Sequence, residues 1–475
     1  MPGEILTIQA GQCGNQVGEE FWGQLLKEHG LDNSGQKIQS NVKSEDKTRP
    51  FFLEVGSDRY TPRAILLDLE PRVIGSIQTK FPDLFDPRLT YMDAAFGGAG
   101  NNWARGFNYG KQHEEDLLEI VDRSLDQCDS PEGFQLVHSV AGGTGSGMGS
   151  FMLELLSDRY PKLFAKSYSV FPDMGNFASE VVVQPYNTLL TLRRLVENCD
   201  VVIPFDNAAL SQVASQSLNV SSPSYSDTNK LISTVMASIT NSIRFPTSFG
   251  TSLQGIFAPL IPSPELSFII PSFTPYTSNY VSFAKKQRRS TGYDVILDLV
   301  NKKNRLVTPS DEHDSHIAAL DVLIGGSFSE QDLFADHKAT IIAKKRLTQP
   351  KWTSQLLQVS HSPRSPYALQ QSPELENVVN GLMLSNNSSI VSLLDKVLRQ
   401  YDRLYSKKAF LNTFTAHDVN GEDIETELEQ AREVVEAFRD GYVSAEQDRW
   451  LEATDQESRD YADGETMDQD QEMGN

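Results

Sequence analysis

The sequence contains little cysteine and no long apolar run. Its three cysteines, Cys13, Cys128 and Cys199, stand far apart in 475 residues, which fits neither a disulfide framework nor a paired zinc motif. No uninterrupted apolar segment approaches the ~20 residues that span a bilayer, and the chain does not open on a basic stretch followed by an apolar run. We therefore expect a protein of the reducing cytoplasm, neither secreted nor inserted in a membrane.

Basic residues are also scarce relative to acidic ones. The chain has 42 Lys and Arg residues against 64 Asp and Glu residues, and its net charge of −22 opposes long-range attraction of nucleic acid. Basic side chains do cluster within 285–289 and 344–346. Each cluster is either a solvated loop or helix end, which we favour, or a contact for an acidic protein partner.

Short β-rich segments alternate with helix-like segments in the first half of the chain. The candidate strands cover residues 4–8, 64–68, 134–140, 167–171 and 200–204. This alternation predicts parallel strands joined by crossover helices. In an open α/β sheet, the ligand site lies in the loops beyond the carboxyl ends of such strands.

The patterning places the chain in the α/β class and divides it into four parts. Residues 1–245 are predicted to form an N-terminal parallel-sheet domain that binds a nucleotide, closed by a long helix over 227–243. A central mixed α/β domain follows over 246–386, and C-terminal helices follow over 387–450. Residues 451–475 are acidic and poor in apolar side chains, so we expect a disordered tail.

Two apolar stripes with alternating four-and-three spacing predict that the C-terminal helices form a hairpin packed on the body. The stripes are Ile390, Leu394, Val397, Tyr401 and Leu404, and then Ile424, Leu428, Ala431, Val435, Phe438 and Tyr442. Neither stripe is long enough to indicate a free coiled coil.

The strongest chemical signal is a glycine-rich segment over 142–149, between an apolar strand and a helix-like run. Glycines let successive backbone N–H groups approach an anion without a Cβ in the way, and the helix start adds the positive end of its dipole. The segment contains no lysine, so it is not a Walker-type loop. It predicts a phosphate cradle rather than a flexible turn. The candidate residues are Ser139, Ala141, Gly142, Gly143, Thr144, Gly145, Ser146 and Gly147.

Two other strand ends supply candidates for the same ligand. Asp68 and Glu70 lie on one face of a strand end and suit Mg²⁺, held through its waters, although solvated carboxylates are the alternative. The turn after the first strand presents N–H groups and amide side chains, and we expect Cys13 there to be a packing contact, not a nucleophile. The candidates in this turn are Gly11, Gln12, Cys13 and Gln16.

The remaining candidates follow the later strands. Asp206 and Asn207 could read ribose or base edges, and Tyr225 could stack on a purine beside Asn229. Each of these is a common turn or cap residue by itself, and their value lies in their order along the chain. The full remaining set is Ala99, Gly100, Asn101, Glu180, Asn207, Tyr225 and Asn229.

Six motifs occur here in the order in which they occur in tubulins. They are GQCGNQ, DLEP, AGNNWA, GGTGSGMG, VVVQPYN and FDN. The chain therefore resembles the tubulin family over nearly its whole length. The resemblance implies that the ligand is a guanine nucleotide, GTP or GDP, with the loop over 142–147 on its phosphates. It also implies that Asn207, Tyr225 and Asn229 lie near the ribose and base.

Two segments are most similar to the γ branch of this family. Residues 183–187 read VQPYN, where α- and β-tubulins have glutamate before the proline, and residues 399–404 read RQYDRL. The resemblance implies a structural protein that nucleates microtubules at a microtubule-organising centre, a centrosome or spindle pole body. Its implied partners are αβ-tubulin along the microtubule axis, other copies of itself at its flanks, and scaffold proteins of the γ-tubulin complex.

One departure from the family concerns catalysis. In α-tubulins the segment after the long helix carries an Asn-x-Asp motif and then a glutamate that orients water against the partner's GTP. The aligned residues here run from Gly250 to Gly255. With glycine at position 255, we expect at most weak GTPase activity. The alternative, an α- or β-type polymer subunit with assembly-coupled GTPase, requires a carboxylate or a lysine near this position.

Overall fold

The fold is described from a computed structural model of the chain. It describes residues 3–38, 46–56, 58–93, 95–173, 181–218, 223–245, 247, 250–275, 291–310, 312–326, 328–353, 357–414 and 423–447. The predicted acidic tail, the basic cluster within 285–289 and the candidate Glu180 lie outside these ranges.

A six-stranded sheet forms the first half of the described chain. Its strand order is β5-β4-β1-β6-β7-β8, and all its neighbouring pairs are parallel. The strands are β1 (Glu4–Ala10), β4 (Ala64–Asp68), β5 (Thr90–Met92), β6 (Pro131–Ser139), β7 (Phe164–Phe171) and β8 (Val201–Asp206). The predicted parallel sheet is therefore confirmed, and the carboxyl ends of all these strands meet at one edge.

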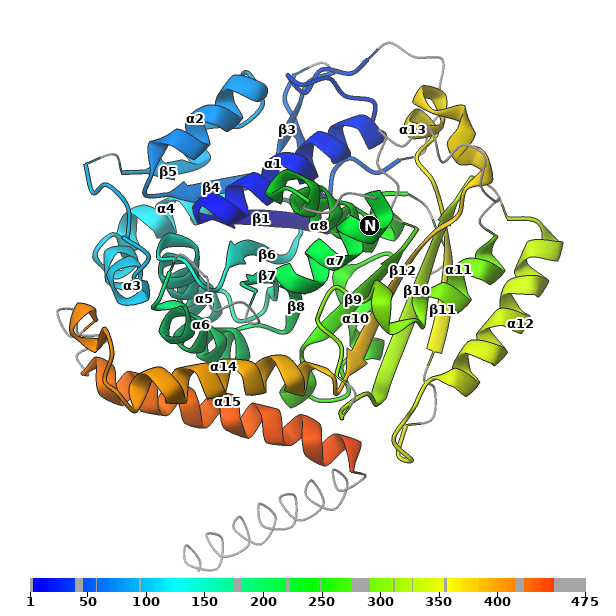
Figure 1. The fold of residues 1–475 in the computed structure, drawn as a ribbon. Helices are drawn as coiled ribbons and strands as arrows, with labels where there is room; N and C mark the ends of the chain where they lie inside the picture. Colours follow the sequence, from blue (N-terminus) through cyan, green and yellow to red (C-terminus); the bar gives the residue numbers. More distant parts are fainter. Residues whose placement is uncertain are drawn as a thin grey trace, which may run out of the picture.

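Helices cover both faces of this sheet (Figure 1). One face packs on α1 (Gly11–Glu28), α2 (Pro71–Lys80), α7 (Asn207–Leu218) and α8 (Tyr225–Ile239). The other packs on α3 (Trp103–Gln112), α4 (Glu114–Leu125), α5 (Gly149–Arg159) and α6 (Gln184–Asn198). Strand β1 supplies Ile5 to the first core and Leu6 and Ile8 to the second, because successive side chains of a strand point to opposite faces.

A second, mixed sheet lies beside the first, as the sequence predicts for the central part of the chain. Its order is β11-β10-β12-β9, with β10 parallel to β11 and antiparallel to β12. The elements are β9 (Ile269–Thr274), α11 (Gly292–Leu299), β10 (His316–Gly325), α12 (Glu330–Arg346), β11 (Leu357–Pro363) and β12 (Asn380–Asn387). The basic cluster 344–346 forms the last turn of α12, where cations favourably meet the negative end of the helix dipole.

Shorter elements complete the described chain. They are the hairpin β2 (Phe52–Glu54) and β3 (Tyr60–Pro62), and the helices α9 (Asn241–Arg244), α10 (Leu253–Phe257) and α13 (Pro366–Gln371). Among the described helices, none combines the length and apolar character that a membrane span requires.

The predicted long helix over 227–243 needs a correction. A capping box of Ser224 and Asp227 starts α8 at Tyr225, and α8 ends at Ile239. The Thr240 hydroxyl lies within hydrogen-bonding distance of the Met236 and Ala237 carbonyls, both at 3.2 Å. The Thr234 and Ser238 hydroxyls make the same kind of bond within the unbroken α8, both at 2.7 Å, so back-bonding alone does not end the helix. The chain continues as the separate α9. The apolar spacing runs through this interruption, so periodicity alone could not reveal it.

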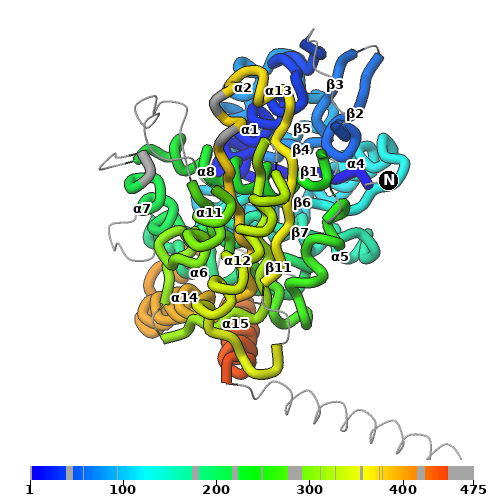
Figure 2. The backbone as a smooth tube through the Cα atoms, turned by 90° about the vertical axis from the view of Figure 1, so that its right-hand side faces the viewer, coloured from blue at the N-terminus to red at the C-terminus, as the bar shows by residue number. Residues whose placement is uncertain are grey.

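The C-terminal hairpin consists of α14 (Ile390–Tyr405) and α15 (Ile424–Glu446). Both predicted stripes face inward, and every stripe residue except the half-buried Leu404 is buried. The hairpin packs under α6, at the opposite end of the molecule from α2 and α13 in both views (Figures 1 and 2). The sequence-based domain limits at residues 245, 386 and 450 stay predictions.

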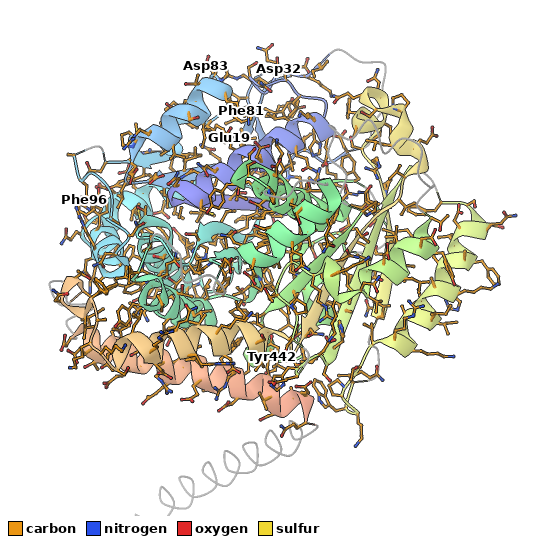
Figure 3. The ribbon with its side chains drawn as sticks, viewed as in Figure 1. Glu19, Asp32, Phe81, Asp83, Phe96 and Tyr442 are labelled. Atoms are coloured by element: carbon orange, nitrogen blue, oxygen red, sulfur yellow. The ribbon has the colours of Figure 1, made fainter. Side chains whose placement is uncertain are left out.

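Buried charges and one tyrosine fix the hairpin to the body. Glu427 of α15 accepts from Arg194 at 2.8 Å and pairs with Arg193 at 3.0 Å, both on α6. Tyr442, labelled in Figure 3, accepts from the Phe268 N–H at 3.0 Å. Glu427 and Arg194 are almost fully buried, so neither can turn to water if its partner is lost.

We expect Glu427→Ala to destabilise the chain by about 2 kcal/mol, because it removes the most buried carboxylate partner of Arg194, which keeps only Glu154 and Glu197 at 3.0 and 3.5 Å. Arg399→Ala is the matched control. The Arg399 side chain is 76% exposed and its ion pair with Asp395 is long, at 3.5 Å, and exposed ion pairs contribute little to stability. Thermal unfolding followed by circular dichroism measures both. A Glu427→Ala midpoint as high as that of the control would show that the buried pair does not hold the hairpin.

Candidate functional site

Two of the predicted loops meet directly at the carboxyl edge of the first sheet. Strand β1 passes into α1 at Gly11, whose φ is +72°. A Cβ at Gly11 would stand 2.7 Å from the Gly145 nitrogen, closer than any side chain can sit. Only glycine therefore allows this turn to approach the loop after β6.

The glycine loop brings in a third predicted segment. It leaves β6 at Ser139, makes a single wide turn over Thr144–Met148 and enters α5 at Gly149. A Cβ on Gly143 would lie 2.8 Å from the Ala99 Cβ and 3.0 Å from the Asn101 nitrogen. The structure thus gathers the backbone of Ser139 to Gly147, Gly11, and Ala99 to Asn101 at one place.

Two buried asparagines tie these loops together, and the sequence analysis gave neither a role. Asn15 donates to the carbonyls of Gly11 and Leu67, both at 3.0 Å. Asn187 donates to the Asn101 carbonyl at 2.7 Å and the Ala141 carbonyl at 2.9 Å. The only sequence signal was their presence in the motifs GQCGNQ and VVVQPYN.

Asn187 also accepts a hydrogen bond, from the Trp103 backbone N–H at 3.0 Å. One amide side chain from α6 therefore joins the segment before α3 to the segment after β6. Since Asn187 is fully buried, these bonds do not compete with water.

A buried histidine supports the glycine loop from the sheet side. His138 of β6 places Nδ1 2.9 Å from the Gly145 carbonyl oxygen and Nε2 2.9 Å from the Ser169 hydroxyl. Burial lowers the pKa of His138 to about 4, because a charged ring would lose its hydration. The neutral ring donates to the Gly145 carbonyl and so fixes the loop.

The two predicted metal-binding carboxylates lie close together at the end of β4. Asp68 is buried, and its Oδ1 accepts from the Glu70 N–H at 3.2 Å. Its Oδ2 accepts no hydrogen bond within the described part of the chain, and burial raises its pKa to about 6. Glu70 is exposed, and its Oε1 would lie 2.8 Å from a Cβ on Gly98.

This donor set fits Mg²⁺ held largely by water and phosphate. An unsatisfied buried carboxylate oxygen is a site that a cation can satisfy, and Mg²⁺ takes one or two carboxylates while keeping several waters. Among the described residues, no group of three or more His, Cys, Asp and Glu side chains gathers at one point. The protein itself therefore supplies too few ligands for a closed metal cage.

The remaining residues of the α1 turn differ in exposure. Gln12 is exposed, whereas Cys13 and Gln16 are half-buried. Burial raises the pKa of the Cys13 thiol to about 12, and the side chain packs against the core beneath α1. Such a thiol stays protonated at neutral pH, which fits a packing contact.

The candidates for ribose and base begin two helices. Asn207 is the first residue of α7, directly after β8, and Tyr225 and Asn229 lie in the first turns of α8. Tyr225 is 78% exposed, and Asn207 and Asn229 are half-buried. The contacts described for the glycine loops do not include these three residues.

Asp206 already has partners within the protein. The sequence offered Asp206 beside Asn207 as a reader of ribose or base edges. Its carboxylate is buried and accepts from the Ala208 N–H at 3.0 Å and from the Thr308 hydroxyl. These bonds leave less of the carboxylate available to a ligand, and the role of Asp206 stays a prediction.

Comparison with known proteins identifies the class of this site. The family model for the Tubulin/FtsZ family, GTPase domain, matches residues 4–215, and that for the Tubulin C-terminal domain matches residues 264–399. The first match spans the whole parallel sheet and the glycine loop. The GTPase domain implies that the ligand is a guanine nucleotide.

Curated relatives narrow the assignment. A tubulin gamma chain of Candida glabrata is 46% identical over 457 residues, 95% of this chain and 96% of the relative. Those of Eremothecium gossypii and Saccharomyces cerevisiae are 43% and 42% identical, over 98% and 95% of this chain and 97% and 94% of the relatives. The chain belongs to the tubulin family, in its γ-tubulin branch.

We expect Gly143→Ala to weaken GTP binding at least about tenfold, or about 1.4 kcal/mol, because the new methyl displaces the Ala99–Asn101 backbone. Gly75→Ala is the matched control: nothing lies within 4 Å of its added Cβ in α2. Calorimetric titration of both variants compares the affinities. Equal affinities would contradict the role of the close backbone approach.

The histidine predicts a specific acid response. Between pH 6.5 and 4, His138 is protonated in the unfolded chain but stays neutral in the folded chain, because burial lowers its pKa. Stability therefore falls as pH falls through this window, by up to about 3 kcal/mol. His138→Asn keeps an amide donor and does not titrate, so its unfolding midpoint should fall less steeply than that of the wild type. Parallel curves of midpoint against pH would refute this.

Proposed function

We propose that this chain binds GTP or GDP with Mg²⁺ at the carboxyl edge of the first sheet and nucleates microtubules by templating αβ-tubulin assembly. The observation that carries the proposal is the meeting of three backbone segments around Gly11, Gly143 and Gly145. Backbone N–H groups in such loops bind phosphate without a lysine. The match to a GTPase domain and the γ-tubulin relatives support the rest.

Each part of the edge has its own proposed role. The loop from Gly142 to Gly147, with Ser139 and Ala141, donates to the phosphates, and the turns at Gly11 and at Ala99 to Asn101 close around them. Asp68 and Glu70 hold Mg²⁺ through its waters, and the bound ion supplies the positive charge that the loop lacks. Asn207, Tyr225 and Asn229 bind the ribose and base.

The opposite edge of the sheet favours a nucleator over a polymer subunit. Helix α10 lies at the start of β6, where the Glu132 carboxylate accepts from the Leu253 N–H. The nine-residue β6 separates it from the glycine loop by about 26 Å. Stacking two such chains head to tail would bring α10 of one toward the nucleotide of the other.

Because residue 255 is a glycine, we expect that such a stack would not hydrolyse GTP efficiently. Gly255 is exposed in α10, and its N–H is 3.0 Å from the Ser252 hydroxyl that caps the helix. A copy of this chain therefore offers no water-orienting carboxylate at that position to a neighbour's nucleotide. The α- or β-type polymer subunit remains the second candidate, and we expect at most weak GTPase activity from this chain alone.

The proposed partners follow from this arrangement. The nucleotide-bearing edge docks αβ-tubulin along the microtubule axis, the flanks contact other copies of the chain, and scaffold proteins array the copies at a centrosome or spindle pole body. Neither nucleic acid nor a membrane is part of the proposal.

We expect the chain, when arrayed on its scaffold, to shorten the lag of αβ-tubulin assembly measured by turbidity, while the free chain has little effect. Copurification should yield scaffold proteins instead of a stoichiometric heterodimer with another tubulin. Filaments grown from this chain alone, or equal nucleation by the free chain, would refute the proposal.

A variant separates the two candidates further. A side chain at position 255 needs only a small shift of the Ser252 hydroxyl, which lies 3.0 Å from the added Cβ, since the next atom, the Gly250 Cα, is 3.9 Å away. We expect Gly255→Glu to leave phosphate release in the presence of αβ-tubulin unchanged. A clear increase would favour the polymer subunit, in which α10 faces a partner's nucleotide.

A further inference from the structure

The segment after α14, Lys408 to Phe414, is held by side chains from the nucleotide edge. Asn102 donates from Nδ2 to the Thr413 carbonyl at 2.8 Å, and the Tyr186 hydroxyl donates to the Ala409 carbonyl at 3.0 Å. Figure 1 shows the segment at the left end of the hairpin, below α3. A piece of the C-terminal hairpin is thus attached to the N-terminal sheet domain.

Both side chains are next in sequence to residues of, or bonded to, the nucleotide loops. Asn102 directly follows Asn101, a candidate phosphate contact, and Asn187, next to Tyr186, holds the carbonyls of Asn101 and Ala141. Tyr186 and Asn187 are both fully buried in the first turn of α6. One rigid turn therefore contacts the phosphate loops with one residue and the hairpin segment with the next.

The hairpin segment itself is under backbone strain. Lys408 and Phe410 have φ of 47° and 59°, the left-handed region that bulky residues avoid. Phe410 is also 51% exposed, so its own burial does not explain the conformation. Local bonds hold part of it, since the Lys408 N–H donates to the Tyr405 carbonyl at 2.8 Å and the Ala409 N–H to the Leu404 carbonyl at 3.2 Å, the pattern of a helix end. The bonds of Asn102 and Tyr186 add to these, and their loss would weaken the hold on the segment.

We infer that the first turn of α6, together with Asn102, couples occupancy of the nucleotide edge to the conformation of Lys408–Phe414. A nucleotide phosphate that fixes Ala99 to Asn101 also fixes the amide of Asn102 against the Thr413 carbonyl. Without the nucleotide, Asn102 is held by the protein alone, through its bonds to Arg105 and Thr413, and the segment opens more often. This inference rests on the proposed nucleotide binding, and it identifies Asn187 and Asn102 as positioning residues.

Limited trypsin digestion tests the coupling, because Lys407 and Lys408 are exposed. In the full-length wild type, GTP with Mg²⁺ should slow cleavage after these lysines at least about fivefold, the lower range of typical coupling. Mass spectrometry of the fragments locates the cut. GTP affinity is measured on the same samples by calorimetry.

Two variants should abolish the protection. Asn102→Ser keeps a cap for α3, where Asn102 now accepts from the Arg105 N–H at 3.1 Å, but its side chain cannot reach Thr413. Tyr186→Phe keeps the ring contacts with Tyr401 and Phe414 and removes only the hydroxyl. The matched control is Tyr405→Phe, whose hydroxyl contacts Glu429 on the solvent side of the hairpin at 2.9 Å.

The outcomes separate this inference from the function on which it rests. Wild-type protein that takes up no GTP would overturn the proposed function. Wild-type protein that binds GTP without protection of the segment, or Tyr186→Phe protein that keeps full protection, would overturn the coupling alone. Loss of protection in Tyr186→Phe but not in Tyr405→Phe supports it, even if Asn102→Ser fails to fold.

Discussion

The structure depends on one constraint: three backbone segments must approach one another at the carboxyl edge of a parallel sheet with no side chain between them. The contact of Gly11 with Gly145, and of Gly143 with Ala99, leaves no room for a Cβ. Backbone groups crowded in this way need partners, and the buried amides of Asn15 and Asn187 provide them. The result is a set of loops already fixed in place, which reduces the cost of ordering them when an anion binds.

The sheet has two edges with different chemistry, which the proposed role at the end of an assembly requires. Glycines, amides and the partly unsatisfied Asp68 lie at the carboxyl edge. The amino edge carries α10, anchored by Glu132 and without a carboxylate at Gly255. The C-terminal hairpin lies across neither edge. It is held under α6 by the buried Glu427 and its two arginines, and the segment after α14 connects it to the nucleotide edge.

The sequence predicted the elements that local pattern determines. Strand β4 occupies 64–68 as expected, and the stripes of α14 and α15 face the body. The prediction of one unbroken helix over 227–243 was wrong because the apolar spacing continues past Thr240, where α8 ends and α9 follows. The short β5 was missed because three residues cannot establish an alternation.

The sequence predicted the parts of the site that local residue composition determines, such as the glycine-rich loop. A glycine-rich loop is visible in the sequence from its composition. Asn187, in contrast, donates hydrogen bonds to residues 46 and 86 positions away, and no local pattern predicts such contacts. The Asp206 carboxylate likewise accepts from Thr308, 102 positions along the chain, a partner that its place after β8 could not reveal. Long-range contacts of this kind decide which polar atoms remain free for a ligand.

All of these contacts matter for function only if the edge of backbone amides takes up a guanine nucleotide. The decisive experiment is calorimetric titration of GTP into the folded, nucleotide-stripped chain in the presence of Mg²⁺, with ATP as the comparison. We expect saturation at one GTP per chain and much weaker binding of ATP. No saturable heat with GTP, or equal uptake of ATP, would contradict this expectation.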